Sequence, residues 1–228
     1  MKRIIISHLS PLLKAIVVAF LPFVTFSCAE SPYSLLRSGD LIFQANSGSD
    51  FVEAIEAVTM AGDSLMSFSH VGIIKVEGGK VSVIEATPEK GVCITPMDEF
   101  LRTSAHDADG RPMVRVMRYS GADAGKVCSR AISLSSQHLG KQYDFAFDPD
   151  MGTVYCSELV FRSFVDDKGD PLFGSNPMTF KDSTGKTSSL WLDYYAKLGK
   201  EIPEGAPGTN PNDMSREPLL ETVPVVFP

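Results

Sequence analysis

The chain has 228 residues, of which 43% are hydrophobic and 21% charged, a composition that suits one globular domain with a single core. Its formal net charge is −7, and no cluster of Lys and Arg follows the first three residues. Because phosphate contacts need a basic patch, this charge pattern excludes nucleic acid from the expected partners.

The first 28 residues have the pattern of an export signal. Lys2 and Arg3 give a positive start, and residues 12–26 are mostly apolar. This run is too short and too interrupted for a transmembrane span, but it fits the apolar middle of a secretory signal. A buried N-terminal helix is the alternative, and the two charges at the start of the run and the Cys at its end argue against it.

Two processing sites compete at the end of this run. Ser27 directly before Cys28 resembles a bacterial lipoprotein signal, in which Cys28 becomes the lipidated first residue, whereas cleavage after Ala29 would fit a plain secretory signal. We favour the lipoprotein, which predicts a signal peptide at 1–28 and one domain at 29–228. The protein would then be anchored to the membrane of the bacterial cell envelope through its lipid, because its acidic surface gives no strong attraction to anionic membranes. Plain cleavage would instead give a soluble periplasmic or secreted protein.

Three cysteines remain after the signal: Cys93, Cys128 and Cys156. Export would allow two of them to pair, and an odd number leaves at least one thiol free unless it pairs between molecules. No two of them have the spacing of a metal site, so the sequence predicts no zinc and no cofactor.

The hydrophobic pattern predicts short strands and helices in alternation. In chain order these are strands at 41–43, 71–76, 81–86 and 93–95, an edge strand at 113–119, helices at about 51–60, 122–139 and 154–165, a helical turn at 97–103, and an extended Pro-rich tail from about 202 that wraps on the domain. Trp191, Tyr194 and Tyr195, at helical spacing before this tail, are predicted to be packing anchors.

A predicted hairpin places a His and a carboxylate on one face. If Gly78-Gly79 forms its tight turn, Glu85 lies opposite Gly72, and His70 is the diagonal neighbour of Glu85. Gly72 has no side chain, which leaves room for Glu85 to lean toward the imidazole. A carboxylate fixes the tautomer of a His and steadies its imidazolium, as a general base requires, although a purely structural pair would show the same pattern.

Cys156 is the candidate nucleophile. Thr153 is a suitable N-cap, which would make Cys156 the third residue of the helix at 154–165. A thiol in the first helical turn lies at the positive end of the helix dipole, which favours the thiolate, and unpaired backbone N–H groups there could hold an oxyanion. The alternative is an inert Cys buried on the apolar stripe of the helix.

Short motifs along the chain occur in an order that resembles a known family. They are Gly39-Asp40-Leu41-Ile42-Phe43, Ser69-His70-Val71-Gly72-Ile73, Ile84-Glu85-Ala86, Tyr143-Asp144, Tyr155-Cys156-Ser157-Glu158-Leu159-Val160 and the Pro/Gly-rich run at 203–211. This set resembles the permuted papain-like family called YaeF/YiiX, within the wider NlpC-type group of cysteine hydrolases.

The resemblance implies an α+β fold in which a small antiparallel β-barrel or sheet carrying the His and Glu packs against the helix that presents the Cys. It implies Cys156 as nucleophile, His70 as base and Glu85 as the orienting carboxylate, an order along the chain that is permuted relative to papain. It also implies that Tyr143 and Tyr155 line the site, where they would contact substrate or the oxyanion.

The expected function is a thiol-dependent amidase or peptidase that acts on peptides, cell-wall peptides included, through an acyl-enzyme. An acyl hydrolase or acyltransferase on lipid-like substrates could use the same triad. A long apolar groove beside Cys156 would favour the lipid substrate, and a polar, open cleft the peptide. The third alternative is an anchored binding protein without catalysis.

Overall fold

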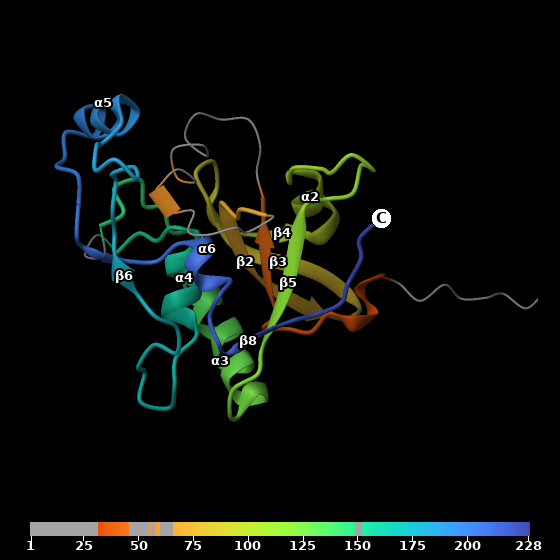
Figure 1. Ribbon diagram of the computed structural model, residues 1–228. Helices are drawn as coiled ribbons and strands as arrows, with labels where there is room; N and C mark the ends of the chain where they lie inside the picture. Colours follow the sequence, from red (N-terminus) through yellow and green to blue (C-terminus); the bar gives the residue numbers. More distant parts are fainter. Residues whose placement is uncertain (1–31, 46–54, 56–57, 60–65, 149–151) are drawn as a thin grey trace, which may run out of the picture. The chain divides into compact units, whose positions relative to one another are not determined.

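The computed structural model describes residues 32–45, 55, 58–59, 66–148 and 152–228 (Figure 1). The predicted signal at 1–28, with Cys28, lies outside these residues, as does most of the helix predicted at about 51–60. Within the described ranges, no helix has the length and apolar character needed to cross a membrane.

The secondary structure confirms the predicted α+β class. The elements are a 3-10 turn at Pro32–Leu35, β1 Leu41–Gln44, β2 His70–Glu77, β3 Lys80–Thr87, β4 Gly91–Pro96, α2 Met97–Arg102, β5 Val114–Tyr119, α3 Ala124–Gln137, α4 Cys156–Ser163, β6 Asn176–Pro177, α5 Ser189–Leu198, β7 Pro207–Gly208, α6 Pro211–Met214 and β8 Leu220–Thr222.

An antiparallel sheet in the order β4-β3-β2-β1-β5-β8 forms the centre of the fold (Figure 1). The pairing of β2 with β3 runs from Ile73 with Ile84 to Glu77 with Lys80, which confirms the predicted register. The turn residues Gly78 and Gly79 both have positive φ, at 57° and 77°, as a tight two-residue hairpin of this kind requires.

Side chains alternate between two buried faces of the sheet, because successive residues of a strand point in opposite directions. One face packs against α3 and α4, and its strand residues include Leu41, Phe43, Val71, Ile73, Ile84 and Ala86. The other face packs against α2 and the end of the tail. Its strand residues include Ile42, Ile74, Val83 and Val116, and the tail contributes Val223 and Phe227 to the same core cluster. Each such side chain contributes about 1.5–3 kcal/mol when it leaves water, so both layers are held firmly on the sheet.

The sequence prediction was wrong about the edge of the sheet and the form of the tail. β5 is not an edge strand, because β8 pairs with it from Met117 with Thr222 to Tyr119 with Leu220. The tail also forms α6, where the Asn210 side chain accepts a hydrogen bond from the Asp213 N–H and caps the helix. A three-residue strand that pairs with a distant segment leaves no local periodicity to detect.

The helix that carries Cys156 begins two residues later than predicted. Val154 forms a parallel bridge with Tyr143 and accepts a hydrogen bond from the Asp144 N–H at 3.2 Å, which keeps Val154 extended. Tyr155, rather than Thr153, is therefore the N-cap, and Cys156 is the first helical residue instead of the third. The helix also ends at Ser163 rather than at 165.

Two acidic residues of the sequence motifs have structural roles. Asp40 is buried and accepts hydrogen bonds from Nε and Nη2 of Arg118 at 2.7 and 2.8 Å, which joins β1 to β5. Asp144 accepts hydrogen bonds from the N–H groups of Ala146 and Asp148 at 2.9 and 2.7 Å, which fixes the loop after Tyr143.

Candidate active site

A buried pair of side chains lies at the start of β2. Nε2 of His70 is 2.6 Å from Oε2 of Glu85, and both side chains are nearly inaccessible to solvent. The β2–β3 ladder ends at Ile73, so the predicted pairing of Gly72 with Glu85 lies beyond it, yet the two side chains still meet.

Gly72 is required by the packing beside this pair. A Cβ at Gly72 would lie 2.3 Å from Cγ1 of Val83 and 3.4 Å from Cβ of Glu85. Val83 is fully buried, so it has little room to move away. The absence of a side chain at Gly72 therefore makes room mainly for Val83, and to a smaller degree for Glu85.

Cys156 meets His70 from the opposite face of the sheet. α4 packs on the face formed by Val71 and Ile73, whereas the His70 ring lies 5.8 Å from the ring of Phe100, in the helix that covers the other face. His70 is the first residue of its strand, so Cys156 can approach it past the end of the sheet, close enough for the thiol to raise the pKa of the imidazole. Because Glu85 occupies Nε2, Nδ1 remains for the thiol.

The electrostatics of the site favour a charged imidazole and a charged carboxylate. Burial alone lowers the pKa of His70, but hydrogen bonds to Cys156 and Glu85 and their negative charges outweigh it and raise the pKa to about 10. Burial alone raises the pKa of Glu85. Hydrogen bonds from His70 and Thr95, together with the charge of His70, outweigh burial, so the pKa of Glu85 is lowered. His70 and Glu85 therefore form a buried ion pair at neutral pH.

Tyr143 and Tyr155 both line the cavity beside Cys156. Burial, together with the negative charge of Cys156, raises the pKa of Tyr143 well above its ordinary value, so its hydroxyl stays protonated and can donate. The Tyr155 hydroxyl accepts a hydrogen bond from the Thr209 N–H at 3.0 Å, which links the first turn of α4 to the tail.

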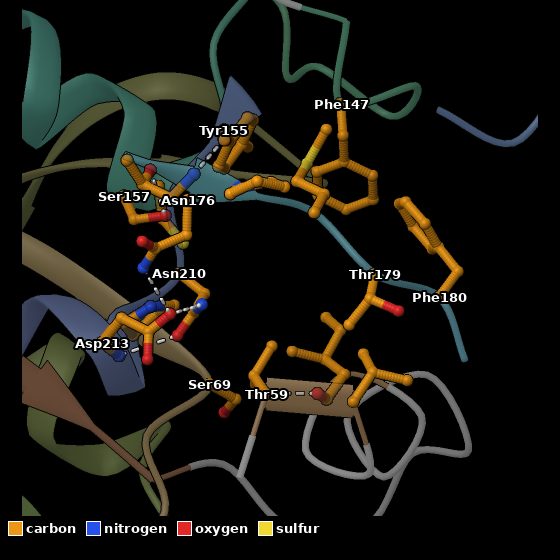
Figure 2. A pocket seen from close by; sticks show the side chains of 18 of the residues that line it. Thr59, Ser69, Phe147, Tyr155, Ser157, Asn176, Thr179, Phe180, Asn210 and Asp213 are labelled. Carbon is orange, nitrogen blue, oxygen red and sulfur yellow. Dashed lines mark hydrogen bonds between the residues drawn. The ribbon is translucent and has the colours of Figure 1, made fainter. Parts of the chain in front are cut away.

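The cavity itself has a volume of about 230 Å³ (Figure 2). Its apolar wall includes Phe147, Met178, Phe180 and Trp191, and its polar side includes Ser157, Asn176, Asn210 and Asp213. Figure 2 shows the two labelled Phe rings apart from the group of Asn176, Asn210 and Asp213, so the lining is apolar toward one end and polar toward the other.

Sequence reasoning missed most of this lining. The two-stranded sheet of β6 and β7 and the start of α6 supply several of its residues. The predicted packing anchor Trp191 is both buried and part of the cavity wall. The Pro/Gly-rich run at 203–211 was the available signal, but composition does not reveal where such a run docks.

Of the other two cysteines, Cys93 lies opposite Glu85 in the β3–β4 pairing, whereas Cys128 lies beside Gly39. Cys93, Cys128 and Cys156 are all free thiols. Across the described ranges, no group of three or more His, Cys, Asp and Glu side chains is arranged to hold a metal ion.

Comparisons with known proteins agree with the fold. A family model described as the permuted papain-like amidase enzyme, YaeF/YiiX, C92 family, matches residues 35–224. The uncharacterized protein YiiX of Escherichia coli strain K12 is 26% identical over 192 residues, which are 84% of this chain and 88% of that protein. A crystal structure of the metalloprotein yiiX from Escherichia coli O157:H7 matches with a TM-score of 0.65 and 24% identity, over 84% of this chain and 98% of that one. These matches confirm the predicted permuted papain-like fold.

Replacing Glu85 by Gln is expected to lower the pH at which His70 loses its proton. The Glu85 charge helps to raise the pKa of His70 from 6.5 to about 10, so the stabilisation from the charged imidazole is fully present below pH 6.5 and is lost as the pH rises through the raised value. Removing the charge brings that loss to lower pH. The measurement is the chemical shift of the His70 ring as a function of pH, by NMR.

The matched control is Glu77→Gln, which neutralises an exposed carboxylate on the same strand as His70. It should leave the titration of His70 unchanged. A His70 titration at the same pH in the wild type and in Glu85→Gln would contradict the role of this ion pair.

Proposed function

Because the chain belongs to the YaeF/YiiX family of permuted papain-like amidases, we propose that it is a thiol-dependent hydrolase that cleaves amide bonds through Cys156, His70 and Glu85. The observation that carries this proposal is the contact between a buried His70–Glu85 ion pair and a thiol at the first residue of a helix. A nucleophile, a base and an orienting carboxylate in contact are the parts that covalent acyl transfer needs.

The proposed reaction begins with a thiolate at Cys156 and an imidazolium at His70. The sulfur attacks the acyl carbon, and the carbonyl oxygen takes the negative charge. His70 then gives its proton to the nitrogen of the leaving amine as the C–N bond breaks, which leaves a thioester on Cys156. Water, deprotonated by His70, attacks this thioester and releases the carboxylic acid and the thiolate.

Two kinds of donor could stabilise the oxyanion in this scheme. Backbone N–H groups in the first turn of α4 have no intrahelical partner and point along the helix axis beside Cys156. The buried, protonated hydroxyl of Tyr143 lines the same cavity. Glu85 acts through His70, by holding the orientation of its ring.

A metal has no part in this scheme. The related Escherichia coli structure is described as that of a metalloprotein. In the described part of this chain, His70 is engaged by both Glu85 and Cys156, and no cluster of three or more suitable ligands is present. The side chains at this site therefore do not fit a protein-bound metal ion.

Cys156→Ala is expected to abolish turnover of cell-wall peptides and of simple amide and thioester probes. The loss should be about 10⁴-fold or more, because the covalent step has no other nucleophile. Ala is small enough to occupy the position at the start of α4, so the thermal unfolding temperature should change little. Cys128→Ala serves as the matched control, and full activity in Cys156→Ala would contradict the assignment.

A second candidate function is hydrolysis or transfer of the acyl group of a lipid-like ester. The observation that favours it is the apolar wall of the cavity beside Cys156, which includes Phe147, Phe180 and Trp191. The same three side chains would carry out the chemistry, and only the group that fills the cavity would differ.

Paired substrates separate the two candidates. Amides and esters of the same acyl groups, from acetyl to octanoyl, should show kcat/KM rising with chain length if the apolar wall receives the acyl chain. Each buried CH₂ contributes about 0.8 kcal/mol, which corresponds to about fourfold in rate. A flat series would mean that the cavity does not bind the acyl chain, and a series in which only the esters react would favour the lipid-like substrate.

We also propose that residues 1–28 direct export and that a lipid on Cys28 holds the domain at the membrane of the bacterial cell envelope. The support is the sequence alone: a basic start, an apolar run and a Cys preceded by a small residue. Cys28→Ala, expressed in a bacterial host, should move the protein from the membrane fraction to the soluble fraction, whereas Cys93→Ala should not. Unchanged membrane association of Cys28→Ala would refute lipid anchoring.

A further inference from the structure

The C-terminal tail reaches both halves of the candidate active site. Its residues 207–214, here called the bridging segment, comprise β7 and α6, and α6 lies beside α4 (Figure 1). This segment also lines the cavity next to Cys156 through Gly208, Thr209 and Asn210. It comes after both Cys156 and His70 in the chain.

Thr209 connects the bridging segment to the nucleophile. Its N–H donates to the Tyr155 hydroxyl oxygen at 3.0 Å, and its own hydroxyl is 3.0 Å from the hydroxyl of Ser157. Tyr155 and Ser157 are the two chain neighbours of Cys156, and Ser157 is fully buried. Thr209 therefore holds the first turn of α4 on both sides of the thiol.

Asn212 connects the same segment to the base. Its side chain is buried, its Oδ1 accepts a hydrogen bond from the Phe68 N–H at 2.7 Å, and its Nδ2 donates to the hydroxyls of Ser67 and Thr59 at 3.2 and 3.0 Å. Phe68 lies two residues before His70 in the chain. Asn212 thus satisfies a buried backbone donor that would otherwise be costly, and it fixes the segment that leads into His70.

The sheet alone leaves this end of β2 partly unsupported. His70 pairs with Gln44 of β1, but the pairing with β3 stops at Ile73. The position of His70 relative to Cys156 therefore depends on contacts made outside the β2–β3 ladder. Thr209 and Asn212 are three residues apart in a segment that Asn210 caps, so a shift of one contact is transmitted to the other.

We infer that Thr209 and Asn212 are positioning residues that set the placement of Cys156 relative to His70. This inference rests on the proposed function, because it concerns the same thiol and imidazole. A misplacement of about 1 Å can reduce the rate of a catalysed step on the order of a hundredfold, so contacts of this kind can decide whether the pair reacts.

The test measures alkylation of Cys156 by iodoacetamide in the folded chain, by mass spectrometry of the peptide that contains it. The pH is set below the range in which an ordinary thiol ionises, so that only a thiolate paired with His70 reacts quickly. Asn212→Leu removes all three hydrogen bonds at similar volume, and Thr209→Val removes only the hydroxyl contact. Both should slow alkylation, Asn212→Leu by about tenfold or more toward the rate of His70→Ala, and Thr209→Ser should restore it.

A matched control separates positioning from general loosening. Val116→Ala removes two buried methyl groups of β5, in the core layer on the side of the sheet away from α4, and Val116 does not line the cavity. It should lower the unfolding temperature without changing the alkylation rate of Cys156. An equal fall in rate for Val116→Ala would overturn the inference.

The remaining outcomes are also decisive. A folded Asn212→Leu that is alkylated at the wild-type rate would overturn the inference, and if that variant does not fold, the partly exposed Thr209→Val decides it in the same way. If His70→Ala itself leaves the rate unchanged, the proposed function fails and the inference with it. A fall for His70→Ala with none for the two tail variants overturns the inference alone.

Discussion

The buried ion pair between His70 and Glu85 is the interaction on which the site depends. Removing one partner from such a pair costs about 3–5 kcal/mol, because the other charge is left buried and unpaired. The fold therefore has to keep both charges, and it does so where β2 and β3 separate beyond Ile73. Gly72 makes this geometry possible, since any side chain there would strike Val83 before reaching Glu85. The same separation lets Cys156 approach His70 past the end of the sheet.

A second constraint fixes where the nucleophile lies along its helix. The bridge between Val154 and Tyr143 holds the chain extended until Tyr155, so that Cys156 is the first residue of α4. This bridge also brings Tyr143 to the wall of the cavity that Cys156 opens into. One backbone contact thus places both the thiol at the positive end of the helix and an aromatic hydroxyl beside it.

The cavity beside Cys156 is built mostly by the second half of the chain. β6, β7, α5 and α6 supply part of its walls, and the bridging segment connects those walls to the helix of Cys156 and to the segment before His70. Substrate choice and the geometry of the reacting groups are therefore linked through the same few residues. A change in the tail alters both, whereas a change in β1 or β5 alters mainly the stability of the sheet.

The sequence by itself determined the elements whose signals are local. The Gly78-Gly79 turn and the alternation around it set the β2–β3 register, and that register put His70 and Glu85 on one face, because side chains in a strand alternate with a period of two. Only the tertiary structure decided the first residue of α4, the partner of β5 and the walls of the cavity. Val154 is extended because Tyr143 pairs with it, β5 is internal because β8 reaches it, and Asn212 lies at Phe68 because the tail folds back. Contacts between residues so far apart in the chain depend on the whole packing, and no periodicity or composition within a single segment encodes them.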